Sequence, residues 1–146
     1  MARQTDTTEG FTEQERAAMK ERSAEMRAEA KRGKSRAAGE KAIQDKIAEM
    51  PEPDRGIAEN YHALVSAVAP DLEPKTWYGM PAYARDGKVV TFFQAAAKFD
   101  SHYSTIGFND AANLDDGVFW PNAFSITAWN GAVEEELRRL VAKAVS

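Results

Sequence analysis

The stretch KTWYGMPAYARDGKVVTFF, from Lys75 to Phe93, decides the fold that the sequence predicts. Polar and apolar residues alternate along it with the period of two that is typical of β-strands. Asp86-Gly87 favours a two-residue hairpin turn, because a type I′ turn requires positive φ at both central positions. We therefore predict two short strands before this turn, Thr76–Tyr78 and Pro81–Arg85. A longer strand follows it, Lys88–Gln94, which is too apolar on both faces to be an exposed edge.

Two further strands and a helix are predicted after this hairpin. Ser101–Phe108 alternates again, and residues 118–128 give a last strand. Pro121 indicates an edge or a bulge there, because proline cannot donate a hydrogen bond to a neighbouring strand. Asn130 is the expected N-cap of a C-terminal helix. The apolar face of this helix consists of Val133, Leu137, Leu140, Val141 and Ala144.

Three helices are predicted before the sheet. Residues 11–32 contain good helix formers without Gly or Pro, and Thr12 with Glu15 can form a capping box. Residues 40–50 form a shorter amphipathic helix. Asp54 suits the N-cap of a third helix. That helix is expected to face the core, because its apolar residues recur at helical spacing: Ile57, Tyr61, Leu64, Val65 and Val68.

The order of these elements predicts an α+β fold. An antiparallel sheet of four to five strands packs against N- and C-terminal helices as a two-layer sandwich. Residues 1–38 form a charged helical arm and linker, with Gly33 and Gly39 bracketing the linker, and residues 39–146 form the domain. The apolar stripe of residues 11–32 is too thin to build a core. This helix is therefore expected to dock weakly, on its own domain, on a partner or on a second copy.

Composition excludes several classes of protein. The net charge of −4 argues against a nucleic-acid binder, because phosphate binding needs an excess of Lys and Arg. No apolar run approaches the roughly 18 residues of a membrane span. The absence of cysteine removes disulfides, thiolate nucleophiles and cysteine-ligated metal sites. We expect a cytoplasmic protein that binds neither nucleic acid nor a membrane.

The opening stretch also carries a family resemblance. Trp77-Tyr78-Gly79-Met80-Pro81-Ala82-Tyr83, followed by Asp86-Gly87-Lys88 and an aromatic strand, resembles the core motif of the YdhG-like domain family. In that family a helix ending near a proline leads into W/Y-G/N-M-P-A-Y/F and a hairpin. The resemblance covers roughly residues 42–144 and leaves the N-terminal arm outside the family's minimal domain.

The resemblance implies a frataxin-like α+β fold and a role in handling intracellular iron, since one bacterial relative is described as an iron chaperone. Most members of the family have no assigned function. Simpler members carry a Lys-x-His cluster at the start of the strand after the hairpin. Here Lys98 and His102 are four residues apart, so that pattern is broken.

Two groups of residues are candidates for binding. The acidic loop offers Asp110, Asp115 and Asp116 for weak carboxylate binding of a hard cation such as iron, although its spacing does not fit an EF-hand. In the other reading these aspartates only form turns. A second candidate is a small-molecule pocket next to the motif. Its expected ligand-binding residues are Trp77, Tyr78, Met80, Tyr83, His102 and Trp120.

No catalytic constellation is found in the sequence. His62 and His102 are the two histidines, and His62 is expected to lie at the edge of the core. A nucleophile elbow and a Gly-rich phosphate loop are both absent. Three functions remain open: a non-enzymatic iron or metal handler, a small-molecule binding module at the Trp77–Tyr83 pocket, and a protein-interaction domain acting through residues 11–32.

Overall fold

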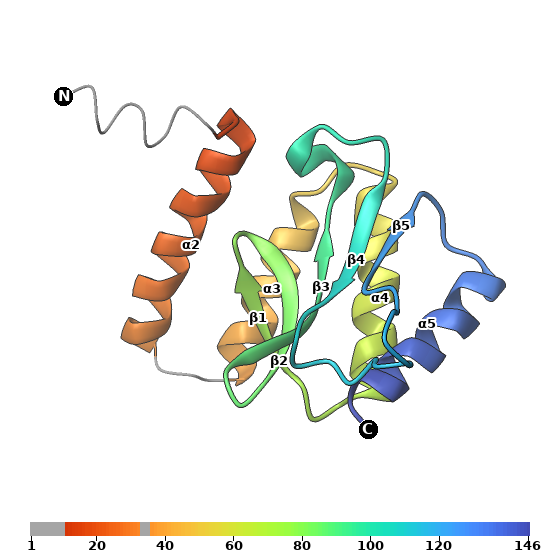
Figure 1. Ribbon diagram of the computed structural model, residues 1–146. Helices are drawn as coiled ribbons and strands as arrows, with labels where there is room; N and C mark the ends of the chain where they lie inside the picture. The colour runs from red at the N-terminus through yellow and green to blue at the C-terminus, as the bar shows by residue number, and fades with distance from the viewer. Residues whose placement is uncertain (1–10, 33–35) are drawn as a thin grey trace.

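The computed structural model describes residues 11–32 and 36–146 of the chain. Within them it forms four α-helices, one 3-10 helix and five strands (Figure 1). The helices are α2 (Glu13–Arg32), α3 (Arg36–Ala48), α4 (Asp54–Val68), η1 (Ala96–Phe99) and α5 (Gly131–Ala144). The strands are β1 (Glu73–Trp77), β2 (Met80–Arg85), β3 (Lys88–Gln94), β4 (Ser104–Phe108) and β5 (Ala123–Ile126).

The five strands form one antiparallel sheet in sequence order, β1-β2-β3-β4-β5. The prediction that Lys88–Gln94 is not an edge strand is confirmed, because β3 lies at the centre. Asp86 (φ 53°) and Gly87 (φ 81°) both have positive φ, as the hairpin turn requires. The pairing of β2 with β3 passes from Tyr83–Thr91 to Ala84–Val89, so Val90 is an extra residue that bulges the strand.

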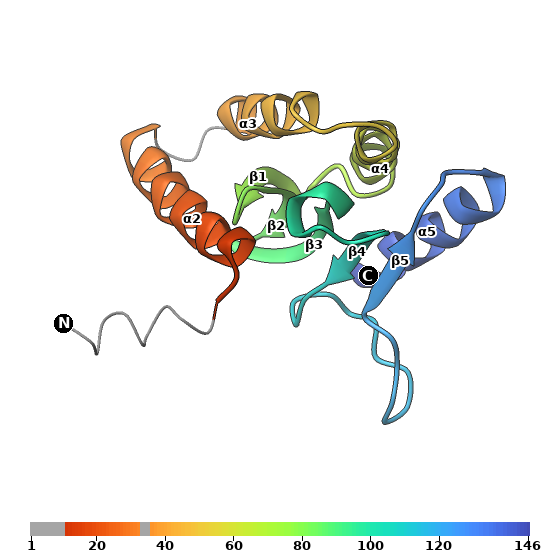
Figure 2. The same ribbon diagram turned by 90° about the horizontal axis from the view of Figure 1, so that it is seen from above.

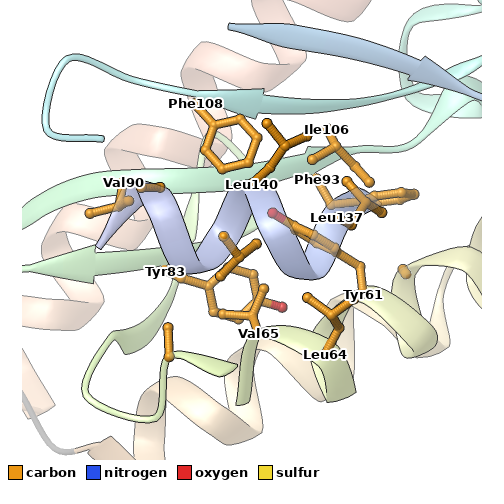
Figure 3. Close-up of a cluster of buried hydrophobic side chains, with 14 of the residues drawn as sticks. Tyr61, Leu64, Val65, Tyr83, Val90, Phe93, Ile106, Phe108, Leu137 and Leu140 are labelled. Atoms are coloured by element: carbon orange, nitrogen blue, oxygen red, sulfur yellow. The ribbon is translucent and has the colours of Figure 1, made fainter. Parts of the chain in front are cut away.

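The helices α3 and α4 cover one face of this sheet, and α5 lies at its β4–β5 side (Figure 2). Side chains from α4, α5 and the facing strands meet in one core (Figure 3). The predicted α+β two-layer sandwich is therefore confirmed. Of the helices in the described ranges, none combines the length and the apolar character that crossing a membrane requires.

The expected helix signals are present at both ends of the chain. The Thr12 hydroxyl accepts from the Glu15 backbone N–H at 3.0 Å, and the Glu15 carboxylate accepts from the Thr12 backbone N–H at 2.9 Å, which completes the capping box. At α5, Asn130 accepts from the Val133 N–H at 2.9 Å. These helix starts were predictable because each depends on residues three apart in the chain.

Several expected element boundaries are wrong. The helix expected at residues 40–50 begins at Arg36, so Gly39 lies within α3 instead of in a linker; Gly33 lies outside the described residues. A Cβ at Gly39 would come within 2.0 Å of the Pro74 carbonyl oxygen, so glycine lets α3 approach β1 closely. The last strand spans only Ala123–Ile126, because Pro121 cannot pair as a strand interior residue.

The first strand and the third helix also differ from expectation. The strand expected at Thr76–Tyr78 is β1, which ends at Trp77 and leaves Tyr78 in a turn. The expected N-cap Asp54 is instead the first residue of α4, after Pro53 at the cap position. Its carboxylate accepts a hydrogen bond from the Ala97 backbone N–H, 43 residues away, and so does not cap its own helix.

Candidate functional site

The motif residues form the tight turn between β1 and β2. Tyr78 (φ 53°) and Gly79 (φ 77°) occupy its two central positions, while Trp77 and Met80 pair across it. The Trp77 ring packs edge-on against Tyr78 at 5.1 Å and also contacts Phe92 on β3 at 5.3 Å between ring centroids. The motif thus builds an aromatic cluster on the sheet face away from α4.

The structure does not gather the six predicted ligand-binding residues into one pocket. Met80 and Tyr83 are three residues apart on one strand and therefore point to opposite faces. Tyr83 is 2% exposed and packs edge-on against Tyr61 in the core at 6.2 Å. Trp120 is partly buried against the core near the other edge of the sheet, and His102 is exposed just before β4.

The β1–β2 turn is instead the place where α2 docks. Glu25 accepts a hydrogen bond of 2.7 Å from the Gly79 backbone N–H. The Arg22 guanidinium lies 6.0 Å from the centre of the Tyr78 ring. Both contacts are polar or charged. Met19 and Met26 on α2 stay exposed, as does Phe11 just before the helix. The described part of the arm thus docks on its own domain.

A second polar cluster holds α2 at the edge of the sheet. Glu21 accepts hydrogen bonds from Lys46 on α3, at 3.0 Å, and from Lys98 on η1. Burial raises the pKa of the Glu21 carboxyl, but the two lysines outweigh it and hold that pKa below its ordinary value. Burial likewise lowers the pKa of Lys46, but the hydrogen bond and charge of Glu21, together with the charges of Glu49 and Glu25, outweigh it and raise that pKa overall. The folded domain therefore favours both charged forms.

Sequence reasoning missed a hydrogen-bond chain that runs from the surface into the core. His62 Nε2 lies 2.7 Å from Glu40 Oε2, and His62 Nδ1 lies 2.9 Å from the Tyr83 hydroxyl. A carboxylate can only accept, so His62 Nε2 carries a proton. Burial raises the pKa of Tyr83. His62 does lie at the edge of the core, as expected, but no signal in the sequence pointed to its partner 22 residues earlier.

The acidic loop lies between β4 and β5, at a distance from the layer of α3 and α4 (Figure 2). Among the described residues, no three His, Cys, Asp or Glu side chains form a group that could hold a metal ion. Asp110, Asp115 and Asp116 therefore do not make a preformed site. The tip of the loop is apolar, with Val118 100% and Phe119 90% exposed.

A cleft lies where the start of α4 meets η1 and the adjoining ends of β4 and β5. We call it the His102 cleft; its volume is about 360 Å³. The residues that matter most for its chemistry are Glu52, Asp54, Ile57, His102, Tyr103 and Ile126. It brings one predicted ligand-binding residue, His102, together with residues that sequence reasoning did not single out for binding.

The wall of the His102 cleft is held by buried hydrogen bonds. Asp54 is 4% exposed, and its Oδ2 accepts from the Ala97 backbone N–H at 2.9 Å. Ser104, also buried, lies 3.4 Å from Asp54 Oδ1 and accepts from the Ala96 N–H at 3.0 Å. The Ser104 hydroxyl is thus engaged in holding η1 in place. The arrangement suits binding better than nucleophilic catalysis.

Comparison of the chain with protein-family models, with curated proteins and with solved structures found no match. The resemblance of the Trp77–Tyr83 motif to the YdhG-like family therefore stays a prediction, and the geometry of the described residues carries the functional argument.

Proposed function

We propose that this chain is a non-enzymatic binding domain and that the His102 cleft is its ligand site. The observation that carries the proposal is the make-up of the cleft. Ile57 and Ile126 provide apolar surface, while a few polar groups, among them Asp54 and His102, converge on the same space. Small-molecule sites combine an apolar lining with a small number of placed polar groups in this way. At about 360 Å³ the cleft lies at the lower end of the usual range for ligand pockets.

Two other hollows support binding less well. One, of about 450 Å³, lies between α2, α3 and β1, and its charged residues already pair with each other, as in Lys46–Glu21 and Lys41–Asp45. The other, of about 470 Å³, is lined mainly by charged residues. Its Arg36 and Arg85 are bonded to backbone carbonyls. A ligand would have to break these contacts before it could bind.

The proposal is tested by screening a small-molecule fragment library against the ¹⁵N-labelled chain by NMR. We expect fragments that bind to shift the amides of residues 96–97 and 101–104. Thr127→Trp, at the rim of the cleft, should block these shifts. Ser125→Trp places the same side chain on another exposed residue, two positions earlier and outside the cleft, and should leave them intact. A library that shifts none of these amides would overturn the proposal.

Iron handling, which the family resemblance implies, is a second proposal with a separate test. Its support is the group of exposed carboxylates Asp110, Asp115 and Asp116, which would have to organise around the ion. The metal-stripped chain is titrated anaerobically with ferrous iron, with magnesium as the control. By calorimetry we expect saturable iron binding that is absent with magnesium and lost in Asp115→Asn/Asp116→Asn. A heat of binding no greater than that measured with magnesium would contradict this proposal.

A protein-interaction role for α2 rests on the apolar side chains that docking leaves uncovered. Met19 and Met26 remain exposed on the docked helix, and so does Phe11 just before it. If this surface joins two copies of the chain, deleting residues 1–32, which leaves α3 intact, should lower the mass measured by light scattering to that of a monomer. If the number of chains per particle is the same before and after the deletion, the chain does not self-associate through α2.

A further inference from the structure

We infer that the His102 cleft selects a small organic cation, with an ammonium or guanidinium group and an apolar remainder. This inference rests on the proposed function and adds the chemical class of the ligand. The first observation is the charge of the lining. Glu52 and Asp54 are the acidic residues among the described residues that line the cleft, and none of these lining residues is a Lys or an Arg. The charge that faces a ligand there is therefore negative.

The second observation concerns Asp54, which is buried without a cationic partner. Its hydrogen-bond partners, the Ala97 N–H and the Ser104 hydroxyl, are both neutral. Within the described residues no Lys, Arg or His lies at ion-pair distance from it. Buried carboxylates are normally paired, because removing an isolated charge from water is costly. A cationic ligand in the cleft would supply the partner that the domain does not.

The N-terminus of α4 compensates only part of this charge. A helix N-terminus carries the equivalent of roughly +0.5 elementary charge, and Asp54 is the first residue of α4. Glu52 is a smaller contributor, because it already forms an ion pair of 3.1 Å with Arg55 and accepts from the Gly56 N–H. The Asp54 wall of the cleft therefore keeps a negative charge.

An organic cation fits the cleft better than a metal ion. The described residues provide no group of three His, Cys, Asp or Glu side chains for a metal, and Asp54 already uses one oxygen for the Ala97 N–H. Ile57 and Ile126 line the cleft and suit an alkyl chain, while the Asp54 carboxylate suits the charged end of the ligand. The lining thus combines the two features that an alkylammonium ion requires.

The inference is tested with three probes of one size: n-butylamine, n-butanol and butyrate, which carry a positive, no and a negative charge at pH 7. Each is titrated into the full ¹⁵N-labelled chain. We expect n-butylamine to shift the amides of Ala97, His102 and Ser104 in a saturable way, with an affinity at least tenfold above that of n-butanol. Butyrate should leave these amides unchanged.

The matched variants are Asp54→Asn and Asp86→Asn. Asp54→Asn keeps an oxygen for the Ala97 N–H but removes the charge, and should weaken n-butylamine binding at least tenfold. Asp86→Asn makes the same charge change in the exposed β2–β3 turn, at the opposite end of the sheet, and should have no effect. If Asp54→Asn does not fold, the three probes on the unaltered chain still decide the question.

The possible failures are distinguishable. If n-butanol or butyrate shifts the cleft amides as strongly as n-butylamine, the cleft binds small molecules but the inferred ligand class is wrong. If n-butylamine binds equally well to Asp54→Asn, the charge of Asp54 does not select the ligand, and the inference is overturned. If neither the probes nor the fragment library shift these amides, the proposed function fails with it.

Discussion

Glu25 on α2 accepts a 2.7 Å hydrogen bond from the backbone N–H of Gly79, 54 residues further along the chain. The turn that joins β1 to β2 therefore also holds the N-terminal helix. This contact lies in a polar interface, where Arg22 Nη1 and Glu25 Oε1 are buried without a hydrogen-bond partner and face each other at 3.6 Å. Because polar groups instead of a broad apolar surface hold α2, its docking should respond to charge.

Glu21→Gln should loosen α2 without unfolding the domain. The substitution removes the charge that Lys46 and Lys98 share, and partly exposed pairs of this kind contribute on the order of 1 kcal/mol. That corresponds to about a fivefold larger undocked population. Hydrogen exchange should show α2 amides that exchange about fivefold faster while the β3 amides are unchanged. Glu59→Gln removes the same charge from an exposed site on α4 and serves as the control.

The docking of α2 should also weaken in acid. The pKa of Glu21 is lowered in the folded domain, so its contribution is present above the ordinary value of about 4.3 and is lost as the pH falls through the lower folded value. The pKa of Lys46 is raised, so its contribution is present below about 10.4 and is lost only as the pH rises through the higher folded value. Docking should therefore be constant from about pH 6 to pH 9.

An NMR titration of the Ala18 and Gly79 amides measures this transition. Both signals should stay constant near neutral pH and move toward those of the undocked helix in acid. In Glu21→Gln the acid transition attributable to this carboxyl should disappear. If an identical transition persists in the variant, another acidic group controls the docking.

The sheet and the core helices were predictable because their signals are local. A two-residue period, the Asp86-Gly87 turn and the helical spacing on α4 each involve residues less than about a dozen positions apart. Most of the core can be named from such patterns. The opposite orientations of Met80 and Tyr83 could also have been found from their odd spacing, which argues against a shared pocket.

The candidate site was less predictable because its contacts join distant parts of the chain. Asp54 and Ala97 are 43 residues apart, and Asp54 and Ser104 are 50 apart. Asp54 showed the typical features of an N-cap, and no local pattern indicates that its carboxylate accepts from η1 instead. His102 was found as a candidate by residue type alone; its cleft depends on how α4, η1 and β4 meet.

Gly39→Ala should destabilise the whole domain. The new Cβ would lie 2.0 Å from the backbone oxygen of Pro74, and a backbone atom cannot swing aside as a side chain can. Separating α3 from β1 should cost about 1–3 kcal/mol, the usual cost of overpacking, despite the better helix propensity of alanine. The measurement is the free energy of unfolding in urea.

Gly131→Ala is the matched control for this prediction. Gly131 is the first residue of α5, and a Cβ there would meet no atom within 4 Å. The substitution should therefore be neutral or stabilise by up to about 1 kcal/mol through helix propensity. Equal effects of the two substitutions would mean that α3 and β1 are not packed as closely as described.

Thr91→Val should cost more than Tyr61→Phe, although both remove one hydroxyl from the same buried pair. The two oxygens lie 2.6 Å apart, and the Thr91 hydroxyl donates to the Gly107 carbonyl at 2.8 Å, so Tyr61 donates to Thr91. In Tyr61→Phe the Thr91 hydroxyl still donates to the Gly107 carbonyl, so the free energy of unfolding should fall by only about 1 kcal/mol. Thr91→Val leaves the fully buried Tyr61 hydroxyl without a partner and should cost about 2–3 kcal/mol.

The double variant Tyr61→Phe/Thr91→Val tests the cause of this difference. It removes both hydroxyls, so no side-chain donor remains unsatisfied, and it should be at least as stable as Thr91→Val alone. Urea unfolding of the four proteins gives the coupling energy between the two sites. Additive losses would show that the two hydroxyls do not interact, and a larger loss in Tyr61→Phe would reverse the assigned direction of the hydrogen bond.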